Sequence, residues 1–191
     1  SESIAYQSPS LSNPRRRVLQ RTDRNGVVTK YEYSTYRDYD LQERVERTRH
    51  IEAFGTPRQR TVEVHKPEGS TLVYKVVAGG RTTYYTYNSR RQVVTQTEKD
   101  DVSGVERTTT NTYCEAVDLA AGCPFIGLLK SVDGPRTDVN DVTTYHYNEQ
   151  GDLFSVTDAL GHTTTYNAYN EFGLPLTITD PNGVVTSLAY D

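Results

Sequence analysis

The chain has 191 residues, of which 35% are hydrophobic and 24% charged, and it contains 15 Tyr but neither Trp nor Met. So many aromatic and β-branched residues are not typical of a disordered chain, and we expect an ordered protein built from β-sheet. The formal net charge of −4 is too small to indicate a nucleic acid or an anionic membrane as the partner.

The chain shows no targeting or membrane segment. No run approaches the roughly 18 consecutive apolar residues of a membrane span, and no basic segment followed by an apolar one opens the chain as in a signal peptide. The first residue is Ser1 and no Met occurs anywhere, so we expect the chain to be a piece of a larger protein.

A group of arginines near the N-terminus could bind phosphates or an acidic partner. Its members are Arg15, Arg16, Arg17, Arg21 and Arg24. Val18 and Leu19 lie among them, and the turn residues 23–26 follow. We therefore favour a strand whose charges line a solvated face.

A short pattern follows this turn and returns five more times along the chain. Its first copy is Thr29-Lys30-Tyr31-Glu32-Tyr33, in which alternate residues share one face of a strand. The last Tyr of each copy, here called an anchor, is Tyr33, Tyr87, Tyr113, Tyr147, Tyr169 or Tyr190. Such repetition predicts a repeat protein in which each unit is stabilised by its neighbours, with the anchors in a structural role.

Residues 35–80 lack the pattern and are interpreted as degenerate repeats. Within them, residues 61–77 are typical of a hairpin around the turn residues 66–70. The apolar spacing in residues 39–54 fits either a helical face or a strand. We favour a strand because strands surround this segment.

Residues 114–126 form an insertion that carries both cysteines. A bridge between Cys114 and Cys123 would close a loop of about ten residues and stabilise the fold by roughly 2.5 to 3 kcal/mol. It would also require an oxidising compartment. The alternative is a pair of reduced, partly buried thiols, and the sequence leaves both possibilities open.

The last third of the chain has the clearest turn signals. Asn148 to Gly151 and Asn170 to Gly173 each place Asn first and Gly where φ must become positive. Residues 158–161 and 180–183 end the strands that follow and start the next unit. The residues therefore predict an all-β fold made of antiparallel β-hairpin repeats.

No pattern in the chain indicates a catalytic, cofactor or metal site. The four histidines and two cysteines lack the close spacings of metal ligands. Asp133, Asp138 and Asp141 could bind Ca²⁺ if their loop folded around an ion, but an Asp that starts a loop is more common. No nucleophile elbow, phosphate loop or dinucleotide fingerprint occurs, so we predict a protein that is not an enzyme.

The segment from Tyr147 to Tyr166, YNEQGDLFSVTDALGHTTTY, resembles the YD repeat of Rhs proteins, and residues 169–191 repeat the match. The resemblance is strong over residues 140–191, good over 17–34 and 81–98, and weak over 35–80. The chain departs from it by Asn in place of Asp after most anchors and by Arg91 where Gly usually stands. Rhs proteins are similar to one another in an Asp-Pro-x-Gly self-cleavage element, but here Asp180-Pro181-Asn182-Gly183 lies inside an ordinary repeat, and we interpret it as a turn.

The resemblance implies a fold and a function. YD repeats in bacterial polymorphic toxins, toxin-complex B and C components and teneurins form a curved sheet strip that spirals into a hollow shell. Residues 1–191 would be a single YD-repeat region, and thus a non-catalytic shell segment around a C-terminal toxin domain in a secreted or cell-surface bacterial protein. The expected partners are the rest of the shell, the toxin domain and possible glycans or secretion components, with self-association through exposed sheet edges. The alternative is a module that binds carbohydrate or a cell surface through its tyrosines.

Overall fold

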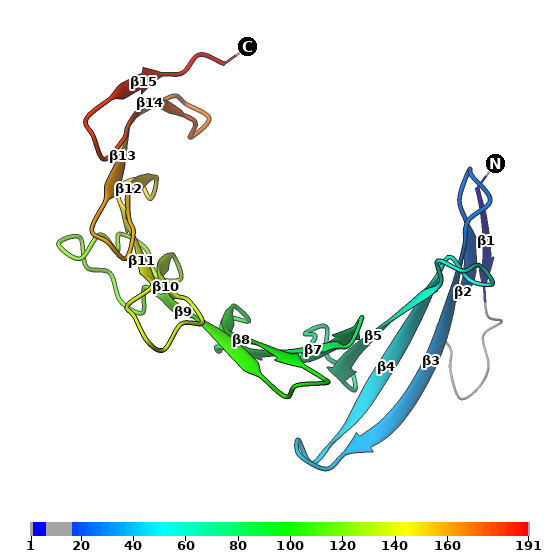
Figure 1. The fold of residues 1–191 in the computed structure, drawn as a ribbon. Coiled ribbons are helices and arrows are strands. Elements are labelled where there is room, and N and C mark those ends of the chain that lie inside the picture. The colour runs from blue at the N-terminus through cyan, green and yellow to red at the C-terminus, as the bar shows by residue number, and fades with distance from the viewer. Residues whose placement is uncertain (1, 7–16, 191) are drawn as a thin grey trace. The chain divides into compact units, whose positions relative to one another are not determined.

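The computed structural model describes residues 2–6 and 17–190, and every regular element in them is a β-strand (Figure 1). The strands are β1 (Ser3–Tyr6), β2 (Val18–Thr22), β3 (Val28–Asp38), β4 (Glu43–Glu52), β5 (Arg60–Pro67), β6 (Lys75–Ala78), β7 (Arg81–Tyr87), β8 (Val93–Asp100), β9 (Glu106–Tyr113), β10 (Leu129–Asp133), β11 (Val142–Tyr147), β12 (Leu153–Thr157), β13 (Thr163–Tyr169), β14 (Pro175–Thr179) and β15 (Val185–Ser187). Within these residues the 15 strands form one sheet in which each strand lies beside the next in sequence. The predicted all-β fold of antiparallel hairpins is confirmed. The same residues include no helix long and apolar enough to cross a membrane.

The described residues fall into two compact units. Unit 1 comprises residues 2–6, 17–86 and 97–106, and unit 2 comprises residues 87–96 and 107–190. Each unit is considered by itself below.

The longest hairpin of unit 1 is formed by β3 and β4. Its register runs without a break from Lys30 opposite Ile51 to Asp38 opposite Glu43. Val45 on β4 is fully buried, with 0% of its surface exposed. Residues 43–52 are therefore a strand, as favoured over a helix, because alternation places Val45 and Ile51 on the same covered face.

The predicted hairpin of residues 61–77 is present as β5 and β6, but its second strand is shorter than expected. It begins at Lys75 rather than Thr71. Tyr74 nevertheless donates its backbone N–H to the carbonyl of His65 at 3.1 Å, so pairing with β5 starts one residue before β6.

The strands of unit 2 have two chemically different faces. Cross-strand partners share a face, and the register pairs Tyr145 with Val156 and Tyr166 with Ile178 on one side. The register places Thr and Ser on the other side, at Thr112, Ser131, Thr144, Ser155, Thr157, Thr163, Thr165 and Thr179. Alternation therefore separates an aromatic and aliphatic face from a hydroxyl face.

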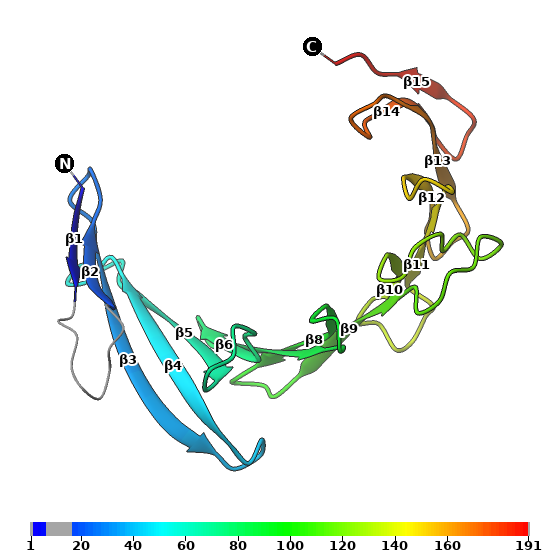
Figure 2. The same ribbon diagram turned by 180° about the vertical axis from the view of Figure 1, so that it is seen from behind.

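Few side chains in the described sequence are buried, because all of its strands belong to a single sheet. The buried hydrophobic residues there are Val45, Ile51, Cys114 and Cys123. Two of these four lie in the loop between β9 and β10, which Figure 2 shows as the long yellow-green loop of unit 2. The hydrophobic interior is thus small, and hydrogen bonds between neighbouring strands and within turns hold much of the structure in place.

Candidate functional site: the tyrosine anchors and the disulfide loop

The turns that precede and follow the anchors share one hydrogen-bonding scheme. In the Asn148 turn, Asn148 N–H donates to the Asp152 carbonyl at 2.9 Å and Gly151 N–H donates to the Asn148 carbonyl at 3.0 Å. Asn148 Oδ1 also accepts from the N–H groups of Gln150 and Asp152. The same scheme recurs in turns that start at Asp23, Asn88, Asp158, Asn170 and Asp180. The four turns predicted in the last third of the chain are therefore confirmed.

The fourth residue of this turn has a positive φ. It is Gly in five of the six turns, but Arg91 takes the position in the Asn88 turn with φ of 66°. The departure noted in the sequence thus leaves the backbone conformation unchanged. In the turn that starts at Asp158, the backbone N–H of His162 and the His162 side chain hold the pKa of the Asp158 carboxyl below its usual value.

Five anchors donate their side-chain hydroxyl to a backbone carbonyl of the preceding strand. The donor and acceptor pairs are Tyr33 to Val18 at 2.8 Å, Tyr113 to Val93 at 2.8 Å, Tyr147 to Leu129 at 2.8 Å, Tyr169 to Leu153, and Tyr190 to Pro175 at 2.7 Å. Partial burial raises the pKa of Tyr33, Tyr147 and Tyr169, which keeps these hydroxyls protonated and able to donate. We call this bond the tyrosine latch.

The latches connect successive repeats. Each accepting carbonyl belongs to the first residue of a strand. For β8, β12 and β14, that strand begins where an Asn turn ends, and β10 begins where the disulfide loop ends. For example, the anchor Tyr147 is followed by the Asn148 turn and then by Leu153. The Leu153 carbonyl accepts the latch of the next anchor, Tyr169. Tyr87 has the same place at the end of β7, directly before the Asn88 turn. The anchor of one repeat is therefore bonded to the first residue after the turn of the previous repeat.

Removing one latch is expected to weaken unit 2 measurably. Tyr147→Phe keeps the ring but leaves the Leu129 carbonyl without its donor, so we expect a loss of about 1 kcal/mol in the free energy of unfolding. Tyr145→Phe on the same strand is the matched control, because no hydrogen bond of that hydroxyl occurs among the described residues. Urea unfolding followed by circular dichroism measures both. Equal losses in the two variants would contradict the latch.

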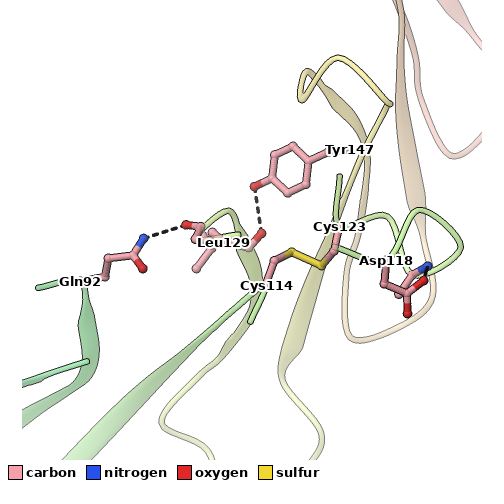
Figure 3. Close-up of a disulfide and its surroundings, with 8 residues drawn as sticks. Gln92, Cys114, Asp118, Cys123, Leu129 and Tyr147 are labelled. Carbon is pink, nitrogen blue, oxygen red and sulfur yellow. Dashed lines mark hydrogen bonds between the residues drawn. A yellow bond between two sulfur atoms is a disulfide. The ribbon is translucent and has the colours of Figure 1, made fainter. Parts of the chain in front are cut away.

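Cys114 and Cys123 form a disulfide with a Cα–Cα distance of 5.6 Å (Figure 3). Their side chains are buried, and residues Asp118 and Cys123 pair as an isolated β-bridge within the loop. The loop is an expanded version of the Asn turn. Cys114 N–H donates to the Leu128 carbonyl and Gly127 N–H to the Cys114 carbonyl, both at 2.8 Å, as Asn148 and Gly151 do in their turn.

The disulfide loop contacts the turn before it and the turn after it. Gln92, whose hydrogen bond is dashed in Figure 3, donates through Nε2 to the Gly127 carbonyl at 2.7 Å, and Arg90 pairs with Glu115 at 2.9 Å. On the other side, Tyr147 N–H donates to the Gly122 carbonyl at 3.1 Å. The ring of Phe125 lies against Gly151, so close that a Cβ there would be 2.8 Å from it. The loop therefore joins three consecutive turns on one edge of unit 2.

This geometry agrees with a match to known families. Residues 147–185 match the family model described as RHS Repeat. Residues 147–185 are therefore similar to RHS repeats. The matched segment begins at the anchor Tyr147, includes Tyr169 and ends at the first residue of β15. The latches of Tyr33 and Tyr113 lie outside that segment and have the same geometry, so the arrangement of latches extends beyond the matched residues. A comparison with curated proteins gave no match.

The charged clusters considered in the sequence are placed as follows. Arg15 and Arg16 lie outside the described residues, whereas the Arg17 guanidinium lies 4.9 Å from the centre of the Tyr33 ring and Arg21 pairs with Glu2 at 3.6 Å. In the aspartate cluster, the Arg136 guanidinium pairs with Asp138 at 2.7 Å, and the backbone N–H of Arg136 donates to Asp141 Oδ2. Within residues 2–6 and 17–190, no three His, Cys, Asp or Glu side chains are grouped to hold a metal ion.

Unit 1 contains a partly buried chain of hydrogen bonds that the sequence did not predict. Tyr74 donates to Asp38 Oδ2 at 2.7 Å, the hydroxyls of Tyr74 and Tyr36 lie 2.9 Å apart, and His65 Nδ1 lies 3.0 Å from the Tyr36 hydroxyl. Because Tyr74 uses its hydrogen for Asp38, Tyr36 must donate to Tyr74 and His65 Nδ1–H to Tyr36. Residues 29 or more positions apart in sequence come together here, and no local pattern marks them.

This tautomer leaves His65 Nε2 without a hydrogen. The atom is buried without a hydrogen-bond partner and lies 3.4 Å from Glu63 Oε2. Burial lowers the pKa of His65, and the nearby cations Lys75 and Arg47 lower it further, against the opposing effect of Glu63. His65 is therefore neutral at neutral pH.

Unit 1 should lose stability as the pH falls below about 6.5, the pKa of an unfolded His. There the unfolded chain binds a proton that the folded chain does not, so stability falls with decreasing pH by at most about 1.4 kcal/mol per pH unit. Urea unfolding at several pH values between neutral and acidic would measure this slope. His65→Gln is expected to remove it, and an unchanged slope in that variant would contradict the assignment.

Proposed function

We propose that this chain is a structural, non-catalytic segment of an Rhs-type β-shell that encloses a C-terminal toxin domain and helps to deliver it. The tyrosine latch carries the proposal. It fixes each repeat to the one before it and uses the anchors for backbone contacts rather than for chemistry. A wall built in this way can be extended one hairpin at a time.

The small hydrophobic interior supports the same role. A single sheet with few buried side chains needs further protein to cover it, and a shell supplies this from its other walls and its contents. The disulfide supports a secreted or cell-surface location, because such bonds persist in oxidising compartments. The proposed partners are accordingly the remaining shell and the toxin domain, with a secretion component during export.

Limited proteolysis of the full-length parent protein tests the proposal. Mass spectrometry would follow whether a C-terminal segment survives inside a protected β-rich core and becomes sensitive once the core is denatured. A parent that carries both Tyr147→Phe and Tyr169→Phe should release that protection at a lower urea concentration than one that carries Tyr145→Phe. A C-terminal segment cleaved as fast as in the denatured protein would overturn the shell.

A second candidate is a carbohydrate- or cell-surface-binding module. It is favoured by the face of unit 2 on which Tyr145 and Tyr166 lie half-exposed beside Val156 and Ile178, since aromatic rings on an accessible face can stack on sugars. Binding of the chain to a glycan array, lost in a Tyr145→Ala and Tyr166→Ala double variant, would support this candidate. It would do so whether or not the parent protects a toxin.

A further inference from the structure

The far end of the β3–β4 hairpin in unit 1 brings two arginines directly opposite each other. Arg37 on β3 and Arg44 on β4 are cross-strand partners in the register. Like charges in this position destabilise a hairpin, because the side chains leave the same face of adjacent strands. The hairpin therefore holds a repulsive pair that its own strands do not relieve.

The two arginines line a surface depression of about 440 Å³ whose lining contains no carboxylate. The other lining residues are Thr35, Tyr36 and Gln42. Arg44 Nε pairs with Glu68 at 3.0 Å, but Arg37 makes no ion pair among residues 2–6 and 17–190. Both guanidinium groups are exposed, so at least one positive charge faces the depression uncompensated.

The backbone beside the depression is also in an unusual conformation. Gln42 has φ of 57°, in the left-handed region that residues other than Gly rarely adopt. The side chain of Gln42 is directed back to the carbonyl of Tyr39, with which it forms a hydrogen bond. This conformation belongs to the turn that joins β3 to β4, as the positive φ of Arg91 belongs to the Asn88 turn.

We propose that this depression binds a tetrahedral oxyanion, the phosphate or sulfate group of a larger ligand, between Arg37 and Arg44. Guanidinium groups bind such oxygens through paired hydrogen bonds, and an anion between them would convert the repulsion into attraction. The hydroxyl of Thr35, which already accepts a weak bond of 3.5 Å from Arg44, offers a further donor. The site is independent of the shell role, because all of its residues lie in one hairpin of unit 1.

Titration of the 191-residue chain with inorganic phosphate and with inorganic sulfate, at constant ionic strength in chloride, tests the proposal. The observable is the NMR signal of the arginine Nε–H groups and of the backbone amides of residues 35–44. We expect saturable shifts in the native chain, weakened about tenfold or more in Arg37→Gln through the loss of one charge-assisted contact. Arg107→Gln, which removes an exposed arginine of β9, is the control and should bind as the native chain does.

Three further measurements complete the test. In chloride alone, Arg37→Gln should leave the hairpin folded and slightly more stable, because it relieves the repulsion. Arg37→Lys, which keeps the charge but not the paired donors, should bind more weakly than the native chain. Titration with a sugar phosphate and with a sulfated disaccharide would then show which ester the site prefers. Shifts that do not saturate, or that are equal in the Arg37→Gln and Arg107→Gln variants, would overturn the site.

Discussion

Gly122→Ala is expected to destabilise unit 2 by about 2 to 5 kcal/mol, the largest effect of any single substitution considered for this chain. A Cβ at Gly122 would lie 2.8 Å from His146 Cβ and 3.0 Å from His146 Cα, and the latter is backbone that cannot move aside. The residue also has φ of +67°, where an L side chain is strained. Clash and strain act together because the disulfide loop lies directly on β11.

The matched control is Gly161→Ala. Gly161 has a similar φ of +84° but nothing within 4 Å of its Cβ position, so only the conformational cost of about 1 to 2 kcal/mol remains. Urea unfolding compares the two variants. Hydrogen exchange measured by mass spectrometry should locate the extra loss in residues 114–128 and 142–147. If both variants lost the same stability, the loop would not be packed on β11 as described.

Replacement of both Cys114 and Cys123 by Ala is expected to lower the stability of unit 2 by about 3 kcal/mol. The bridge spans nine positions in sequence, and chain-entropy arithmetic for so short a loop gives about 2.7 kcal/mol. Loss of the buried sulfur contacts adds to this. Because the loop also contacts the turns on either side, faster exchange should extend to residues 88–92 and 147–151.

A reductant provides the control for the disulfide. It should destabilise the native chain to a similar extent and leave the double Ala variant unaffected, while exchange in β3 and β4 of unit 1 stays the same in every sample. A native chain whose unfolding curve did not respond to the reductant, with its thiols shown to be free, would contradict a stabilising bridge.

The sequence predicted the strands and turns well because their determinants are local. Alternation at Thr143 to Tyr147 and the Asn-x-x-Gly signals at 148–151 and 170–173 act within a few residues, and each was found as expected. The start of β6 was misplaced at Thr71, since the β-branched and aromatic residues 71–74 favour a strand in isolation. In the structure their place after the Gly69 turn delays the pairing with β5 until Tyr74 and Lys75.

The features that depend on register could not be predicted. The anchors were recognised as structural, but the acceptor of each hydroxyl lies 15 to 20 residues earlier and is a backbone carbonyl, which has no sequence signal. The same limit applies to the His65 hydrogen-bonded chain and to the Arg37 and Arg44 pair. The turn at residues 39–42 sets which residues of β3 and β4 face each other, and its sequence has no Gly to indicate that geometry.

The disulfide loop is much longer than the Asn turn, but the strands that each of them joins are aligned in the same way. Twelve residues, 115–126, stand between Cys114 and Gly127 where two stand between Asn148 and Gly151, yet the closing hydrogen bonds are the same. The edge turns of this sheet are therefore places where the chain can acquire new surface without a change in how the adjoining strands are aligned. Variation among proteins built on this plan would be expected to concentrate at those turns, while the strands between them keep their lengths.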